Sequence, residues 1–102
     1  KWGGGTVTLT IKDQYKNMSE IIADCMNLIE NSKTACEHAG IEPLVLPIRG
    51  GTDGCQLSFK GLPCPNLGTG GHAYHGPYEH ITVEGMDMTV AMLVKLVETF
   101  IE

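Results

Sequence analysis

The 102-residue sequence has no apolar run near the roughly 18–20 residues that span a membrane, which excludes a transmembrane protein. Basic residues are scarce as well: 7 Lys and Arg stand against 12 Asp and Glu, and the formal charge of -5 argues against a nucleic-acid-binding surface. Aromatic residues make up only 6%, while 42% of residues are hydrophobic and 19% are charged. This composition excludes a largely disordered chain and predicts one globular domain or part of a larger one.

The sequence also lacks any Cys-x-x-Cys pair. The spacings of Cys25, Cys36, Cys55 and Cys64 fit no zinc ribbon. Cys25 and Cys36 fall in one helical pattern, and continuous helix would separate them by about 16 Å, which is too far for a disulfide. We therefore expect the cysteines to be small buried apolar residues of a reduced, cytoplasmic protein, and a disulfide framework is the weaker interpretation.

An initiator methionine and the apolar core of a signal peptide are both missing from the amino terminus, which reads Lys-Trp-Gly. We expect a chain that was either processed or cut from a longer protein.

The elements that are present alternate between strands and helices. Apolar and threonine residues alternate over 6–11, the run at 43–48 is almost entirely apolar, and 62–67 is a short strand with prolines at 63 and 65. Helices are predicted over 19–39, from Thr52 or Asp53 to about Lys60, and after Thr82. The order strand–helix–strand–helix–strand–helix predicts an α/β fold with a partly parallel sheet.

Three further details of the helices are predicted. Gly40 ends the first helix, and Asn31-Ser32-Lys33 weakens its middle, so that two shorter helices are an alternative. The last helix has an apolar stripe that we expect to face the core, made of Met86, Val90, Leu93, Val94, Val97 and Ile101.

Two unusual loops, at 49–54 and 68–80, follow predicted strands, where ligands bind in α/β sheets. Arg49 offers a fork of donors that matches a carboxylate or phosphate, and Gly50 and Gly51 leave room for a ligand. From this segment alone, an arginine in a surface turn is slightly favoured. Asp53 is expected to cap a helix, with orientation of a neighbouring side chain as the alternative.

The second loop contains His72, His75 and His80, and imidazole is a common metal ligand. Their spacing matches no helical zinc motif, so solvated histidines are the simpler interpretation. His75-Gly76 is the most suggestive pair, and Glu79 is either a ligand or an ordinary surface carboxylate.

Several separated motifs stand out along nearly the whole chain: Asp13-Gln14-Tyr15, Asn17-Met18, Pro47-Ile48-Arg49-Gly50-Gly51-Thr52-Asp53-Gly54, Gly61-Leu62-Pro63-Cys64-Pro65-Asn66-Leu67, Thr69-Gly70-Gly71, Tyr74-His75-Gly76 and Val83-Glu84-Gly85-Met86. Together, and without gaps, they resemble the signatures of one family, the peptidase T tripeptide aminopeptidases.

The family belongs to the dinuclear zinc exopeptidases related to carboxypeptidase G and aminoacylase. The resemblance implies that residues 1–16 end a lid or dimerisation domain and that residues 17–102 form the C-terminal part of the catalytic domain. It implies two zinc ions per active site, a short peptide substrate, contact with the remainder of the catalytic domain, and a homodimer as one possible assembly.

By the same resemblance, His75 is a zinc ligand, Arg49 contacts the carboxylate end of the substrate, and Asn17 lies at the lid junction within reach of the substrate. The family's other zinc ligands and its general base, a glutamate, have no counterpart in this chain. We therefore expect an aminopeptidase that cleaves the first peptide bond with metal-activated water, no catalytic residue in this chain, and no activity from the chain alone.

Two alternatives remain. The Thr-rich strand at 6–11 suggests a stand-alone binding or dimerisation module that pairs edge to edge. His72, His75 and His80 suggest a small mononuclear hydrolase.

Overall fold

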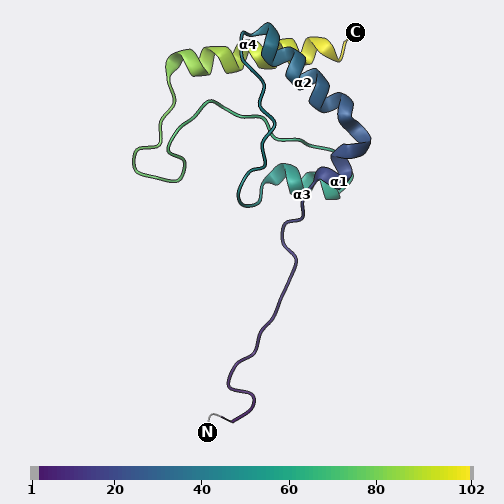
Figure 1. The fold of residues 1–102 in the computed structure, drawn as a ribbon, viewed down its shortest axis with the longest axis vertical. Helices are drawn as coiled ribbons and strands as arrows, with labels where there is room; N and C mark the ends of the chain where they lie inside the picture. The colour runs from purple at the N-terminus through teal and green to yellow at the C-terminus, as the bar shows by residue number, and fades with distance from the viewer. Residues whose placement is uncertain (1–2, 102) are drawn as a thin grey trace.

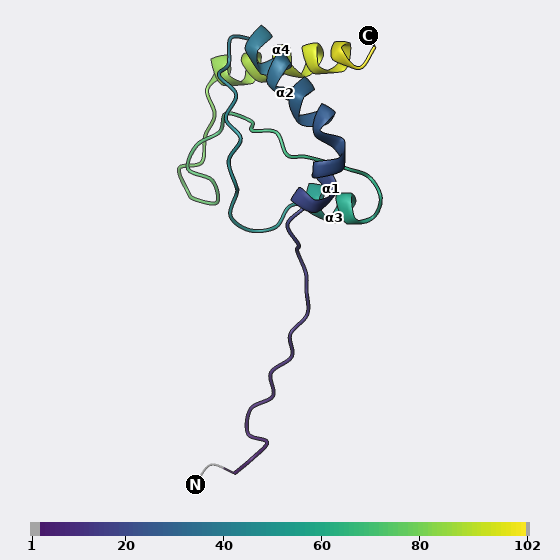
Figure 2. The ribbon, with the colours of Figure 1, turned by 45° about the vertical axis from the view of Figure 1, so that its right-hand side comes forward.

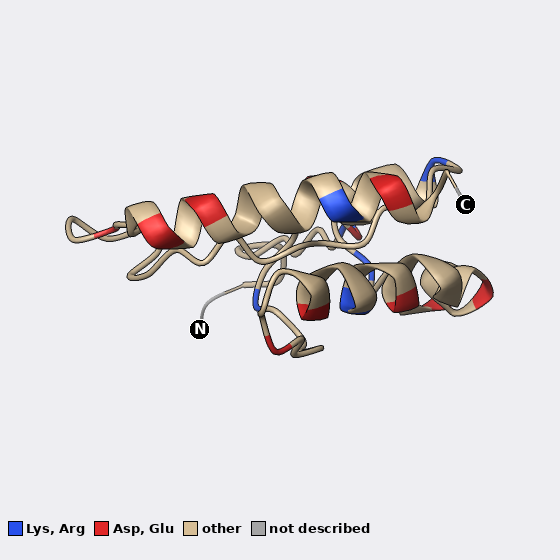
Figure 3. Ribbon diagram, turned by 90° about the horizontal axis from the view of Figure 1, so that it is seen from above, with Lys and Arg blue, Asp and Glu red and all other residues tan. Residues whose placement is uncertain are grey.

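The structure, a computed structural model, describes residues 3–101. This part of the chain contains α1 (Ser19–Ile22), the 3₁₀ helix η1 (Ala23–Cys25), α2 (Met26–His38), α3 (Asp53–Phe59) and α4 (Val83–Thr99). α2 packs against α4 and α1 packs against α3, so two helix pairs lie one above the other (Figure 1). Seen from above, α2 and α4 run side by side (Figure 3). None of the helices described is long and apolar enough to cross a membrane.

The predicted strands are not observed. Residues 6–11, 43–48 and 62–67 are extended, but the only β pairing in the described residues is an isolated bridge between His72 and His80. Alternating residues identify backbone suited to a sheet, but a strand forms only where a neighbour lies at hydrogen-bonding distance. The segment that holds residues 6–11 instead leads away from the helices (Figures 1 and 2). The strand–helix layout with a partly parallel sheet is therefore not confirmed.

The amino-terminal segment accounts for the elongated shape. The chain measures 66 × 37 × 18 Å, with a radius of gyration of 18.7 Å. A compact domain of this length would have a radius of gyration of about 13 Å. Val7, Leu9 and Ile11 are 85%, 80% and 79% exposed, so the apolar side of this segment has no cover within the described residues.

The first helical stretch is interrupted, but not where the sequence suggested. The break lies at Cys25, whose backbone angles are φ -132° and ψ 42°. Residues 31–33 continue α2, because Ser32 Oγ donates to Leu28 O at 2.7 Å and Lys33 pairs with Glu30 at 3.1 Å. Polar side chains that bond within their own helix are tolerated in its interior, so residues 31–33 remain helical and the alternative of a break there is wrong.

The predicted helix ends are confirmed. Thr52 and Thr82 cap α3 and α4 by accepting from the backbone N–H of Cys55 and Gly85, at 3.3 and 3.0 Å. α2 ends at His38, and Gly40, just beyond the C-cap Ala39, has φ +78°. Ile41 N donates to Cys36 O at 2.8 Å. Together with the bond from Gly40 N to Glu37 O, this is a Schellman motif, which needs a residue at positive φ.

Thr52→Ala is expected to lower the free energy of unfolding by about 1–2 kcal/mol. The Thr52 hydroxyl accepts from Cys55 N and, at 3.1 Å, from the Asn66 side-chain amide, so two bonds are lost. Chemical denaturation of the two proteins measures the difference. Thr10→Ala, in the exposed amino-terminal segment, is the control, and equal stability of both variants would contradict the expectation.

The face that α4 buries differs from the prediction. The buried apolar side chains are Ile22, Ala35, Cys55 and Met92, and Ala35 and Met92 lie in α2 and α4. The predicted stripe is exposed, with Met86 at 45% and Val97 at 64%. α4 is apolar on more than one side, so periodicity alone could not identify the side that meets α2.

The four cysteines are free thiols, as expected. Their predicted burial holds for Cys55 but is wrong for Cys25, Cys36 and Cys64, which are partly exposed.

Candidate functional site

Arg49 lies in an exposed bend between the extended segment 41–48 and α3. Gly50 has φ +88°, a conformation that favours glycine, and the bend ends at the Thr52 cap of α3. Asp53 is the first residue of α3 rather than its cap, and its carboxylate suits the positive end of the helix dipole. α3 thus fixes the carboxyl side of the turn that carries Arg49.

The segment 14–18 docks on this turn and on α3. Gln56 Nε2 donates to Gln14 O, and the Cys55 thiol donates to Lys16 O. The Tyr15 ring covers Gly51 so closely that a methyl group there would overlap it. These contacts bridge about 40 residues of sequence and join the proposed domain junction to the Arg49 turn.

Asn17 lies in the same segment and is exposed. Its side-chain oxygen accepts from the backbone N–H of Ser19, the first residue of α1, at 2.9 Å. Such a bond from an asparagine to the backbone two residues on fixes a turn. The side chain therefore has a local structural role through its oxygen. Its amide nitrogen could still donate a hydrogen bond to a substrate.

The loop of residues 68–80, called the Gly/His loop below, is closed at its base by His72 and His80. Their backbones exchange two hydrogen bonds, at 2.8 and 3.1 Å, and their rings stack with centroids 5.2 Å apart. His80 Nδ1 also lies 2.8 Å from Tyr78 O. These two histidines hold the loop together, a role that explains them without a metal ion.

His75 lies inside this closed loop, in a turn formed by the bond from Gly76 N to Ala73 O at 3.2 Å. Its backbone has φ +62°, and Ala73 has φ +55°. Left-handed backbone is uncommon outside glycine and concentrates at functional sites, although histidine tolerates it better than most residues. The neighbouring Tyr74 hydroxyl lies 3.2 Å from Thr69 Oγ1, which ties the turn to the loop's first half. The exposed His75 imidazole is thus presented on a tied turn.

The positions of these histidines bear on the predicted mononuclear metal site. Among residues 3–101, no three His, Cys, Asp or Glu side chains are placed to bind one metal ion. The mononuclear site of His72, His75 and His80 is therefore wrong for this geometry, since two of these imidazoles stack on each other. The described residues therefore do not form a complete zinc site by themselves.

The segments that carry Arg49 and His75 lie on the same side of the helices, away from the carboxyl end of α4 (Figures 1 and 2). No hydrogen bond within the described residues joins Arg49, Asn17 and His75. The structure therefore presents three exposed groups on two tied loops, without assembling them into one pocket.

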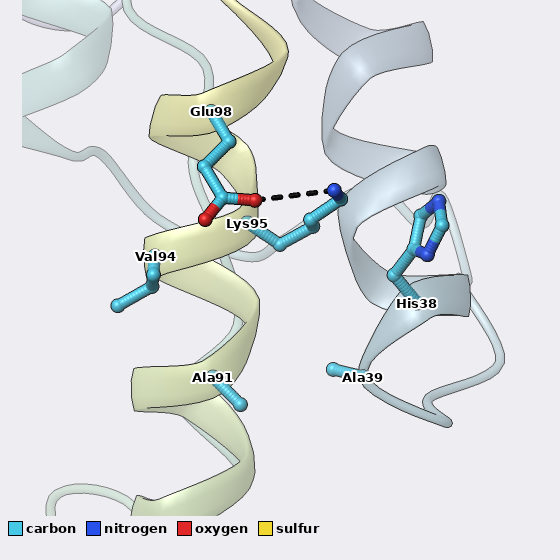
Figure 4. Close-up of a pocket in the computed structure, with 6 residues that line it drawn as sticks. All are labelled: His38, Ala39, Ala91, Val94, Lys95 and Glu98. Atoms are coloured by element: carbon cyan, nitrogen blue, oxygen red, sulfur yellow. Dashed lines mark hydrogen bonds and ion pairs between the residues drawn. The ribbon is translucent and has the colours of Figure 1, made fainter.

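The cavities lie elsewhere. One, of about 420 Å³, opens between the end of α2 and α4, where Lys95 pairs with Glu98 at 3.1 Å (Figure 4). A second, of about 340 Å³, lies between α4 and the segments 41–44 and 67–70, and its lining is mainly apolar. Neither is lined by Arg49, Asn17 or His75.

Comparison with known proteins finds relatives that match nearly the whole chain. The chain is 54% identical over 100 residues to the peptidase T of Caldanaerobacter subterraneus subsp. tengcongensis and 50% identical over 100 residues to that of Alkaliphilus oremlandii. It is 49% identical over 102 residues to the peptidase T of Clostridium perfringens. The chain is thus similar, along nearly its whole length, to part of peptidase T. No family model matches it.

These matches cover 98–100% of the chain but only 24% or 25% of each peptidase T. The chain thus spans about a quarter of the length of the curated relatives it matches. The resemblance read from the separated motifs is confirmed by identity along the whole chain.

Sequence reasoning missed the contacts of Tyr15, Cys55 and Gln56. Each is a side chain of one loop or helix that meets a backbone far along the sequence. Gly51 was the only local signal, because a glycine beside a predicted binding residue suggests a close approach.

Proposed function

We propose that this chain is the C-terminal part of a zinc-dependent tripeptide aminopeptidase, with residues 1–16 ending a lid or dimerisation domain and residues 17–102 in the catalytic domain. The observation that carries the proposal is the identity of 49–54% to proteins named peptidase T, maintained along 98–100% of the chain. The matched regions include both exposed loops, which favours a shared site as well as a shared fold.

In this proposal His75 provides one ligand to a centre of two zinc ions. Its imidazole is exposed and held on a tied turn, and neutral imidazole is a common zinc ligand. The other ligands and the general base come from parts of the protein outside this chain. Zinc in such a centre activates water for peptide hydrolysis.

Arg49 is proposed to bind the free carboxylate of the peptide, and Asn17 to approach the substrate from the domain junction. Arg49 is exposed at the start of the turn, and the space beside Gly50 is open, whereas the Tyr15 ring fills the space over Gly51. A planar fork of donors binds a carboxylate through two parallel hydrogen bonds. This arrangement favours short peptides, since the amino end must reach the zinc while the carboxylate reaches Arg49.

The function is tested in the full-length protein with tripeptides, their amino-terminally acetylated forms and a chelator. We expect release of the first residue from free tripeptides, no cleavage of acetylated ones, and loss of activity with the chelator that added zinc restores. Cleavage of acetylated peptides, or activity that survives complete zinc removal, would reject the proposal.

Arg49→Ala in the full-length protein is expected to lower kcat/KM for tripeptides with a free carboxylate by about 10–100-fold, mainly through KM. A charge-assisted bond contributes about 1.5–3 kcal/mol, and binding shared by ground and transition states appears in KM. Carboxamide tripeptides are the control, because they have no charge for Arg49 to pair with. Equal losses on both peptides would count against this role.

The remainder of the catalytic domain is proposed to cover the exposed apolar residues. Leu44, Val45 and Leu46 are 74%, 67% and 70% exposed, and the outward stripe of α4 is exposed too. Burial of such surface stabilises association by about 25 cal/mol per Å². Homodimer formation and a cytoplasmic location, which the free thiols favour, belong to the same proposal.

A second candidate, a stand-alone binding or dimerisation module, is favoured by one observation: the extended segment 6–11 has no pairing partner in residues 3–101 and exposes alternate apolar side chains. Sedimentation of the isolated chain tests it. A discrete dimer at micromolar concentration that Val7→Lys dissociates would support the module, and a monomer would remove it.

A further inference from the structure

The contacts between residues 14–18 and the Arg49 turn carry an inference about how Arg49 is held. Gly51 stands two residues after Arg49, and its open face is covered by the Tyr15 ring. Any side chain at position 51 would overlap that ring. Gly51 is therefore needed for a close approach between two distant segments, beyond any need for an unusual backbone angle.

The ring is itself fixed in place by its neighbours along the chain. Gln14 O and Lys16 O, on either side of Tyr15, accept bonds from Gln56 and Cys55 of α3. Ser58, which is buried, lies with its hydroxyl 3.8 Å from Met18 Sδ and accepts from Cys64 N at 3.0 Å. Segment 14–18 is thus attached to α3 along its length, and the backbone of Tyr15 cannot move away from Gly51 without breaking these bonds.

The amino-terminal side of the Arg49 turn has few other restraints. Arg49 is exposed, and a Cβ at Gly50 would meet open space. A flexible turn would have to be ordered each time a carboxylate bound, and ordering a loop lowers affinity. A ring seated on the turn fixes it before the ligand arrives.

We propose that Tyr15 is a positioning residue for Arg49: its ring, seated on Gly51, holds the turn in the conformation that receives the peptide carboxylate. The proposal rests on the proposed function, because it assumes that Arg49 binds the substrate. Since Tyr15 lies at the junction between the two proposed domains, it also ties the domain boundary to the substrate-binding turn.

The test is a double-mutant cycle in the full-length enzyme with Gly51→Ala, Tyr15→Ala and both together. Gly51→Ala is expected to raise KM for a free tripeptide by about tenfold, with kcat changed less, because the methyl group displaces the turn. Tyr15→Ala is expected to raise KM several-fold. In the double variant the overlap is gone, so its KM should match that of Tyr15→Ala alone. Multiplied effects, or a silent Gly51→Ala, would overturn the proposal.

Two variants separate positioning from a general loss of structure. Tyr15→Phe keeps the ring and is expected to retain the wild-type KM, whereas loss of function in this variant would assign the effect to the hydroxyl and overturn the proposal. Gly68→Ala is the matched control, since a Cβ at Gly68 meets nothing within 4 Å and its KM should not change.

Carboxamide tripeptides distinguish the two proposals. If Arg49→Ala affects free and amidated peptides equally, the substrate role of Arg49 fails and this inference fails with it. If Arg49→Ala is selective for the free carboxylate but the Tyr15 and Gly51 effects multiply, only the positioning role of Tyr15 is wrong.

Discussion

His75→Ala in the full-length protein is expected to lower kcat for tripeptide cleavage by roughly 10³-fold or more and to reduce the zinc content. Loss of one ligand changes both the affinity of the site and the charge available at the reacting carbonyl, and a loss of several kcal/mol in transition-state stabilisation corresponds to this factor. Metal analysis and steady-state kinetics on the same preparation measure both effects.

Two other histidines are the controls. His38→Ala changes an exposed residue at the end of α2, beside a cavity remote from the Gly/His loop, and should leave activity and zinc unchanged. His80→Ala removes the stacking partner of His72 and is expected to loosen the loop, with a smaller loss than His75→Ala. Full activity in His75→Ala would reject His75 as a ligand.

The isolated 102-residue chain is expected to show no peptidase activity and only weak zinc binding. Residues 3–101 place no three ligand side chains around one metal position, and one imidazole is not enough for a stable zinc site. The comparison is with the full-length protein at equal molar concentration, with zinc added to both, and with cleavage followed by release of the first residue.

The isolated chain is also expected to be of low stability, because most of its apolar side chains are exposed. Only Ile22, Ala35, Cys55 and Met92 are buried among the apolar residues described, which leaves little hydrophobic stabilisation for a chain of this length. Chelator-sensitive cleavage by the isolated chain would contradict this part of the account and would place a complete active site within it.

The helix ends could be predicted from the sequence because their chemistry is local. Thr52 and Thr82 bond to the backbone three residues ahead, and Gly40 supplies the positive φ that a Schellman motif requires. The resemblance to peptidase T could also be predicted, since Arg49-Gly50-Gly51-Thr52-Asp53 and Tyr74-His75-Gly76 are separated motifs that both point to it.

Features that depend on distant partners could not be predicted. Residues 6–11 have the pattern of a strand, yet no neighbour pairs with them among residues 3–101. α4 buries Met92 instead of the predicted stripe, because a helix that is apolar on several sides does not identify the side that α2 will meet. The seat of Tyr15 on Gly51 joins segments 36 residues apart, and neither segment specifies the other.

Anomalous diffraction at the zinc edge from crystals of the full-length protein would locate zinc relative to His75 and Arg49. We expect a zinc ion with a His75 imidazole nitrogen about 2.0–2.1 Å away, and the Arg49 guanidinium facing the same cleft. Zinc bound without His75, or His75 and Arg49 opening to separate surfaces, would contradict the assignment of these two residues to one peptide-cleaving centre.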